Sequence, residues 1–375
     1  MSKHHPENER IKHRYRVYLQ DARGQSEASI DKALSAIHAF ETFTRHASFR
    51  KFHIEQARAF TRDLKARTNP ATGKPYAKAT LNGQLSDMRR FVAWLGGQPE
   101  CRKRIAYGDA DYFRLNEKDE RIARATRQKR VPSVDEVERV IFAMPHGSDI
   151  EKRDRAVVAF SLLTCARVSA VASARLKHVD VTEALFHQDA RDVKTKRSKT
   201  FTTWFFPVGD DIRLIVTDWI AHLTGALHFG PDDPLFPRTR LGHDENRHFV
   251  PIGLERENWA TGQPIRAIIA DAFRQEDLPP PSGQHVFRDT IAKLGEQRCP
   301  TPEAFKAWSQ NMGHDQVLTT FTSYGQVSPE RQAEIIRSIA KQDNATINRT
   351  GEPDPETVKW VFDHVGKAFG KKAND

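Results

Sequence analysis

Cysteine is scarce in this 375-residue chain, and its three cysteines are far apart. Cys101, Cys165 and Cys299 lack the close paired spacing of a zinc site, and an odd number of scattered thiols does not suit a disulfide framework. We therefore expect three ordinary reduced thiols.

Long hydrophobic runs are also missing. No stretch approaches the roughly 18 to 20 uninterrupted apolar residues of a membrane span, so no transmembrane segment is predicted. The first sixteen residues, MSKHHPENERIKHRYR, are polar and basic and lack the apolar region of a secretory signal. We expect no membrane partner and a cytoplasmic protein.

Positive charge, by contrast, is in excess. The net charge is +10, with 59 Lys and Arg against 49 Asp and Glu. Residues 1–130 carry an excess of about 13 positive charges, and the remainder is close to −3. An excess confined to one third of the chain favours a surface that binds a polyanion such as a nucleic acid over a merely soluble surface.

Residues 1–98 are predicted to form a small helical domain. Apolar residues recur every three to four positions in four segments between Glu7 and Gly97, and the last of these ends at a Gly-Gly pair, as a helix C-terminus often does. The apolar stripes are expected to form the core. The cations on the opposite faces are candidates for contacts with DNA phosphates: Arg62, Lys65, Arg67, Lys74, Lys78, Arg89 and Arg90.

Residues 99–131 lose this periodicity and end in a basic run, which predicts an interdomain linker. A second domain is expected over 132–342, followed by a tail at 343–375 with a possible helix. The start of the second domain is marked by Ser133 and Glu136, which form the S-x-x-E pattern of a capping box ahead of an apolar helix.

The second domain is predicted to be mainly helical with one small antiparallel sheet. Helical segments are expected through Asp154–Thr164, Asp211–Leu223 and Pro264–Phe273, with a loop-rich stretch before the last. Short β-like runs precede and follow a basic hairpin tip that includes Lys194, Lys196, Arg197 and Lys199.

Residues able to act on an anion recur along this domain in a fixed order. Arg167 lies at a turn between two helical patterns and precedes the lysine hairpin. His285 and Arg288 follow in an H-x-x-R pair, and then come His314 in a Gly-His turn and Tyr324 in TTFTSYG. Each residue alone has an ordinary structural explanation. In this order they resemble the tyrosine recombinases, or phage-type integrases.

The resemblance extends over Arg10–Lys341 in layout and is strongest over Gln284–Val327. It implies a SAM-like helical core-binding domain and a catalytic domain that together form a C-shaped clamp around double-stranded DNA. It also implies self-association into a tetramer on paired sites, and a location at the nucleoid. One of two apolar helices, Arg331–Lys341 or 358–369, could couple the subunits, although both could equally fold onto their own core.

The resemblance also assigns roles. Tyr324 would attack a phosphodiester, form a 3′-phosphotyrosyl bond and release a 5′-hydroxyl, without metal or other cofactor. Arg167 and Arg288 would neutralise the non-bridging oxygens, since a guanidinium stays charged and donates two bonds to one phosphate. His285 would assist proton transfer at the tyrosine, and His314 would donate to a non-bridging oxygen.

A lysine of the hairpin would protonate the leaving 5′ oxygen. Lys194 is the first choice and Lys196 the second, and the spacing does not separate them. Lys196 and Arg197 are further candidates for DNA contacts at the hairpin.

Three features depart from the family pattern. His314 lies 26 positions after Arg288, a few more than is common, and Tyr324 lies ten positions after His314, one more than usual. Ala170 stands where an acidic residue is commonly found three positions after the first arginine. Two other functions remain open on the sequence: a type IB topoisomerase-like enzyme that nicks and reseals one strand, and a non-catalytic DNA-binding protein derived from an integrase.

Overall fold

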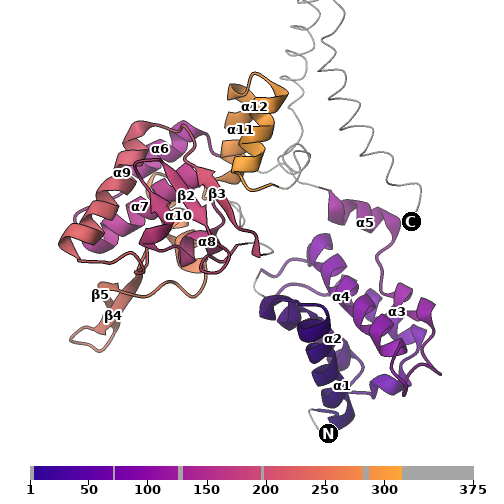
Figure 1. Ribbon diagram of the computed structural model, residues 1–375. Coiled ribbons are helices and arrows are strands. Elements are labelled where there is room, and N and C mark those ends of the chain that lie inside the picture. Colours follow the sequence, from indigo (N-terminus) through magenta and orange to yellow (C-terminus); the bar gives the residue numbers. More distant parts are fainter. Residues whose placement is uncertain (1–3, 71, 126–129, 196–197, 282–286, 315–375) are drawn as a thin grey trace, which may run out of the picture. The chain divides into compact units, whose positions relative to one another are not determined.

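The computed structural model describes residues 4–70, 72–125, 130–195, 198–281 and 287–314. The chain divides into two compact units, Met1–Arg127 and Gln128–Asp375 (Figure 1). Four predicted site residues lie outside the described residues, as do both apolar helices predicted near the C-terminus. These site residues are Lys196, Arg197, His285 and Tyr324.

The first unit is helical, as its apolar periodicity predicts. The elements are α1 (Pro6–Val17), a π-helical turn η1 (Tyr18–Ala22), α2 (Glu27–Phe43), η2 (Phe49–Lys51), α3 (Ile54–Ala66), α4 (Lys78–Gly96), η3 (Tyr107–Tyr112) and α5 (Glu117–Arg124). The four long helices coincide with the four predicted ones. Aromatic rings fill their core, with Phe40 packed edge-on against both Phe60 and Phe113.

Residues 99–131 differ from the predicted linker. Cys101, Ile105, Phe113 and Leu115 are buried in the core of the first unit, and α5 packs against α4. The sequence lacks helical periodicity here because the apolar residues sit on short turns, where burial follows no fixed spacing. Much of this stretch therefore belongs to the first unit.

The second unit is built around one buried helix. Ser133 caps α6 (Val134–Ala143) in the predicted capping box: its hydroxyl accepts from the Glu136 amide at 3.1 Å, and the Glu136 carboxylate accepts from the Ser133 amide at 2.9 Å. The next helix, α7 (Asp149–Thr164), is buried from Ala156 to Thr164. It contacts α6, α8 (Val168–Ser173), α9 (Asp210–Ala221) and α10 (Gln263–Gln275).

A small antiparallel sheet lies against this core, as predicted. Its strands run in the order β1 (Val179–Asp180), β2 (Leu185–Gln188) and β3 (Phe201–Trp204), with Phe186 opposite both Val179 and Thr203. A short 3-10 turn, η4 (Leu176–His178), precedes it, and a π-helical turn, η6 (His222–Ala226), follows α9.

A second, two-stranded sheet was not predicted. Strands β4 (Arg238–His243) and β5 (Phe249–Glu255) form a hairpin that projects from the body of the second unit (Figure 1). Leu241, Phe249 and Ile252 are exposed on it. The loop-like composition of this stretch, rich in charge, Gly and Pro, hid its strands because apolar residues on an exposed hairpin are not confined to one face.

Two packed helices complete the described part of the unit. In α11 (Arg288–Arg298), Gly295 lies so close to α12 (Pro302–Asn311) that a Cβ there would meet the Trp308 indole at 2.6 Å. The residues between Arg288 and His314 thus form the rest of α11 and a second helix, α12. None of the described helices is long and apolar enough to cross a bilayer.

Candidate active site

Arg288 is the centre of the candidate site. It begins α11, and its side chain is only 3% exposed. One terminal nitrogen, Nη1, donates to the Cys165 carbonyl at 2.9 Å. The other, Nη2, donates to the Met312 carbonyl and to His314 Nε2, both at 2.7 Å. The guanidinium therefore joins the end of α7 to the turn after α12, two segments that are far apart in the sequence.

No carboxylate among the described residues pairs with this buried cation, and its Nε has no hydrogen-bond partner there. Arg153, which is also deeply buried, shows the contrast. Its Nε and Nη2 donate to Asp154 at 2.9 and 2.7 Å, and its Nη1 donates to Pro237 and Thr239. Burial of an unpaired charge is costly. Arg153 is thus a satisfied structural residue, whereas Arg288 has no counter-ion in the described part of the chain.

His314 is positioned by the end of α12. The amide of Gly313 donates to the Gln310 carbonyl at 2.7 Å and that of His314 to the Ser309 carbonyl at 3.2 Å, the bond pattern of a Schellman motif. Gly313 has φ +74° in this turn. Because an arginine is only a donor, His314 Nε2 accepts from Arg288, and a neutral His314 carries its proton on Nδ1.

Strand β3 holds this turn in place. The side chain of Asn311 bonds both backbone groups of Trp204: it accepts from the amide at 2.8 Å and donates to the carbonyl at 2.9 Å. A Cβ added at Gly313 would lie 2.6 Å from the Phe201 ring. The turn therefore needs glycine both for its backbone angle and for its close approach to β3.

Arg167 lies just beyond the end of α7. Cys165 caps that helix in the left-handed region at φ 52°, and Arg167 is the N-cap of α8. The sharp reversal directs the Cys165 carbonyl to Arg288 and leaves Arg167 half-buried. Burial raises the pKa of the Cys165 thiol to about 11, even though Arg288 and Arg167 act in the opposite direction.

Lys194 is fixed through its backbone. Its amide donates to Ser173 Oγ at 2.8 Å, and its carbonyl accepts from Ser169 Oγ at 3.1 Å. The preceding Val193 is buried in the core. The lysine side chain is exposed, and its Nζ donates to the Ala260 carbonyl at 3.3 Å.

Solved structures with the same architecture identify the fold. A lambda integrase dimer bound to a COC′ core site matches with a TM-score of 0.58 and 13% identity, over 86% of this chain and 96% of that one. A Tn1549 transposon integrase in complex with transposon right end DNA matches with a TM-score of 0.56 and 13% identity, over 88% and 99%. The chain has the fold of the tyrosine recombinases.

A third structure with this tyrosine recombinase fold is the XerH site-specific recombinase bound to a palindromic difH substrate. It has a TM-score of 0.55 and 15% identity, over 87% of this chain and 83% of that one. No family model and no curated protein sequence matches the chain. The lambda integrase and Tn1549 integrase matches confirm the mainly helical fold with a small antiparallel sheet that the sequence predicts.

Four of the six predicted catalytic residues lie in the described part of this recombinase fold. Arg288 and His314 are in direct contact, and Arg167 follows closely on the carbonyl that Arg288 binds. Lys194 is tied to the helix that Arg167 caps. Ala170, at the position of the expected acid, is 1% exposed and packs into the core.

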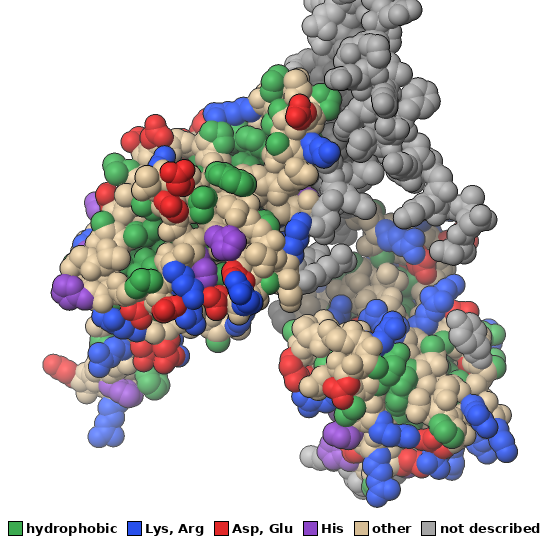
Figure 2. Space-filling view, viewed as in Figure 1, with side chains coloured by type: hydrophobic (Ala, Val, Ile, Leu, Met, Phe, Trp, Pro, Cys, Tyr) green, Lys and Arg blue, Asp and Glu red, His purple; other side chains and the backbone are tan. Residues whose placement is uncertain are grey.

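The predicted DNA-binding cations of the first unit are mostly paired. Asp119 of α5 bonds both Lys65 at 3.2 Å and Lys78 at 3.1 Å. Arg89 pairs with Asp111, Arg90 with Asp87, and Arg67 with Asp63. Arg62 and Lys74 are exposed, with no ion pair among the described residues. Figure 2 shows this mixture of basic and acidic side chains on the visible face of the unit.

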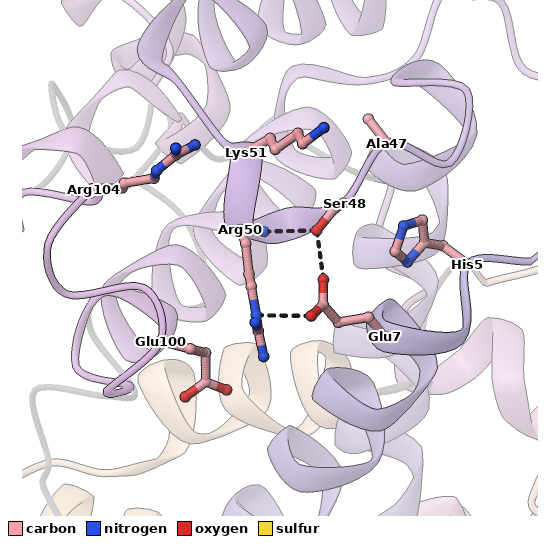
Figure 3. Close-up of a pocket in the computed structure, with 8 residues that line it drawn as sticks. All are labelled: His5, Glu7, Ala47, Ser48, Arg50, Lys51, Glu100 and Arg104. Carbon is pink, nitrogen blue, oxygen red and sulfur yellow. Dashed lines mark hydrogen bonds and ion pairs between the residues drawn. The ribbon is translucent and has the colours of Figure 1, made fainter.

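One cavity of the described residues is separate from these groups. It has a volume of about 640 Å³ in the first unit, where Arg50 pairs with Glu7 at 2.8 Å and Ser48 donates to Glu7 at 2.7 Å (Figure 3). A smaller one of about 460 Å³ is lined by Lys177 and His178, among others, beside the sheet. Neither is lined by a predicted catalytic residue. No metal-binding group of His, Cys, Asp or Glu occurs among the described residues.

Sequence reasoning missed the residues that support the site. Ser169, Ser173 and Asn311 carry no sequence signal of their own, since each acts through a backbone group of a distant segment. Gly313 had such a signal, because a glycine directly after a predicted helix marks a left-handed C-terminal turn.

Proposed function

We propose that this protein is a site-specific DNA recombinase or integrase that cleaves and rejoins strands of duplex DNA through a 3′-phosphotyrosyl intermediate. One observation carries the proposal: within the described part of the chain, Arg288 is a buried cation without a carboxylate partner, beside His314 and with its Nη1 bonded to the Cys165 carbonyl, two residues before Arg167. A phosphodiester supplies the missing negative charge. The fold shared with recombinases in complex with DNA supports the same function.

In the proposed reaction the Tyr324 oxygen attacks phosphorus, and the bond from phosphorus to the 5′ oxygen breaks. The negative charge that develops on the non-bridging oxygens is stabilised by Arg167 and Arg288. His285 takes the tyrosine proton, and Lys194 gives a proton to the leaving 5′ oxygen. A 5′-hydroxyl from another strand then attacks the phosphotyrosine, so that no external energy source is consumed.

The bond between Arg288 and His314 constrains the role of the histidine. While Nε2 accepts from Arg288, the ring proton of a neutral His314 is on Nδ1, so Nε2 itself does not donate to a phosphate oxygen. When the phosphate engages the Arg288 guanidinium instead, Nε2 is released. Binding of the anion and the freeing of His314 are therefore coupled.

The two units are proposed to share the DNA. The first unit provides the basic surface that includes Arg62 and Lys74, and the second provides the catalytic residues. A clamp of two domains follows from the resemblance, as does a tetramer on paired sites.

The test is formation of a covalent protein–DNA adduct. Duplexes bound by the protein are first selected from a random-sequence pool, and nicked versions of them are incubated with the protein under denaturing trapping. Wild type is expected to form the adduct in the presence of a chelator, and Arg167→Ala is expected to form it about 10²- to 10³-fold more slowly.

Arg62→Ala serves as the matched control, since it removes an exposed arginine that is outside the catalytic groups. It should weaken DNA binding modestly and leave the cleavage rate at saturating protein unchanged. Binding of duplex DNA without any adduct on the selected sequences would instead show a DNA-binding protein without cleavage activity.

A further inference from the structure

The backbone amide and carbonyl of Lys194 are both hydrogen-bonded to one short helix, α8. Ser173 Oγ accepts from the Lys194 amide at 2.8 Å, and Ser169 Oγ donates to the Lys194 carbonyl at 3.1 Å. These two serines are one helical turn apart on α8 and thus share a face. Both hydrogen-bonding groups of the Lys194 backbone are therefore held by this serine pair, which we call the α8 clamp.

The same helix starts at Arg167. The Arg167 carbonyl accepts from the Ala170 amide at 2.8 Å and the Val171 amide at 3.1 Å, so this residue is part of the first turn of α8. Val168 anchors the helix, since a Cβ at Gly262 would lie only 2.7 Å from it. The backbones of Arg167 and Lys194 are thus attached to one short rigid element.

The α8 clamp fixes the position of the Lys194 backbone and leaves the lysine side chain accessible. Ser173 is 5% exposed, and its hydroxyl proton goes to the Ser169 carbonyl at 2.9 Å, which leaves an oxygen lone pair for the Lys194 amide. The lysine side chain remains exposed. A proton donor needs this combination: a fixed backbone, and an exposed ammonium group that can exchange the Ala260 carbonyl for the leaving oxygen.

We propose that Ser173 and Ser169 are positioning residues for proton donation by Lys194, and that α8 sets the distance between the arginine that binds the phosphate and the lysine that protonates the leaving group. This inference rests on the proposed recombinase function. It also selects Lys194 over Lys196 as the proton donor.

A change of leaving group separates this role from a general structural one. With oxygen at the scissile 5′ position, the breaking bond takes up a proton from the Lys194 ammonium, which becomes a neutral amine. With sulfur there, the thiolate leaves without a proton, since thiols ionise with a pKa of about 8.5. A defect in proton donation is therefore corrected by sulfur, whereas a defect in folding, DNA binding or phosphate binding is not.

The experiment compares single-turnover cleavage of the two DNA substrates, built on a selected duplex whose scissile position has been mapped. Lys194→Ala is expected to slow cleavage of the oxygen substrate about 10²- to 10⁴-fold. Ser173→Ala should slow it about 10- to 100-fold, because small misplacements of a catalytic group have effects of this order. Ser169→Ala, a change at a half-buried position with less risk to folding, should have a smaller effect in the same direction.

On the sulfur substrate all three variants should come within about threefold of wild type. Ser161→Ala is the matched control: Ser161 is also 5% exposed in a helix and donates to a carbonyl four residues back, at 2.7 Å, but its hydroxyl contacts no site segment. It should cleave both substrates like wild type, and Lys196→Ala should not show selective recovery with sulfur.

The possible failures are distinguishable. The clamp is wrong, and the recombinase function stands, if the cleavage rate of Lys194→Ala recovers with sulfur but that of the serine variants does not respond to it. Such serine variants would be equally slow on both substrates, or equal to wild type on both. If the cleavage rate of Lys194→Ala does not recover with sulfur, Lys194 is not the proton donor, and the proposed role of the two serines is refuted as well. If wild type forms no adduct, the proposed function and the clamp are both refuted.

Discussion

Replacing Gly313 by alanine should disrupt the site from the turn that carries His314. Two penalties add at this position. The backbone has φ +74°, where an L-residue loses about 1–2 kcal/mol. In addition the new methyl would lie 2.6 Å from two carbons of the Phe201 ring, and overpacking of this kind costs about 1–3 kcal/mol.

The expected total is therefore a loss of about 2–5 kcal/mol in the free energy of unfolding, which lowers the Tm of a unit of this size by roughly 5–15 °C. Relief of the overlap also moves the turn away from β3 and separates His314 Nε2 from Arg288. Thermal denaturation measures the first effect, and the rate of adduct formation measures the second.

A double-mutant cycle tests the structural reasoning. Phe201→Ala removes the ring, so that Gly313→Ala in that background should cost only the backbone term of about 1–2 kcal/mol. Gly24→Ala is the control for that term, since Gly24 has φ +57° with nothing within 4 Å of an added Cβ. An equal cost of Gly313→Ala with and without the Phe201 ring would refute the close contact.

Three further predictions concern other parts of the chain. Burial raises the pKa of Tyr15 to about 12, whereas a free tyrosine ionises near pH ~10. Because the unfolded chain loses this proton first, the free energy of unfolding of the first unit should fall as the pH rises from about 10 to 12. Denaturant titrations at several pH values should show this slope for wild type and lose it in Tyr15→Phe. Asp119→Asn should release Lys65 and Lys78 and raise the affinity for duplex DNA about two- to tenfold at low salt, with the gain shrinking as salt increases; an unchanged affinity at low salt would show that these lysines do not contact DNA. Asn311→Ala removes both bonds to Trp204 and should cost about 1–3 kcal/mol of stability and slow adduct formation, as measured by denaturation and by the trapping assay.

Helices were predictable where their apolar residues recur at helical spacing. The four long helices of the first unit and α6 with its Ser133–Glu136 capping box follow from local patterns. The structure of the 99–131 stretch was not predictable in this way, because Cys101 and Phe113 lie on irregular turns and are nevertheless buried in the core. The β4–β5 hairpin was missed because its apolar side chains are exposed and give no one-sided pattern.

The sequence predicts the residue types of the candidate site, but not the contacts that position them. The order of arginine, lysine, histidine and tyrosine suggested a phosphoryl-transfer centre, and the structure brings Arg288 and His314 together at 2.7 Å. The contacts that hold them are made by the Cys165 and Met312 carbonyls and by the serines of α8. Backbone carbonyls are present at every residue, so the sequence does not reveal which of them a distant side chain binds.

The central claim is that a tyrosine of this chain becomes covalently joined to DNA, and the most direct measurement is identification of the joined residue. The adduct trapped on a selected nicked duplex is digested with protease and nuclease, and the modified peptide is sequenced by mass spectrometry. We predict a nucleotide attached through phosphate to the oxygen of Tyr324, and no adduct from Tyr324→Phe. A nucleotide on any other residue, or an undiminished adduct from the Phe variant, would contradict the account.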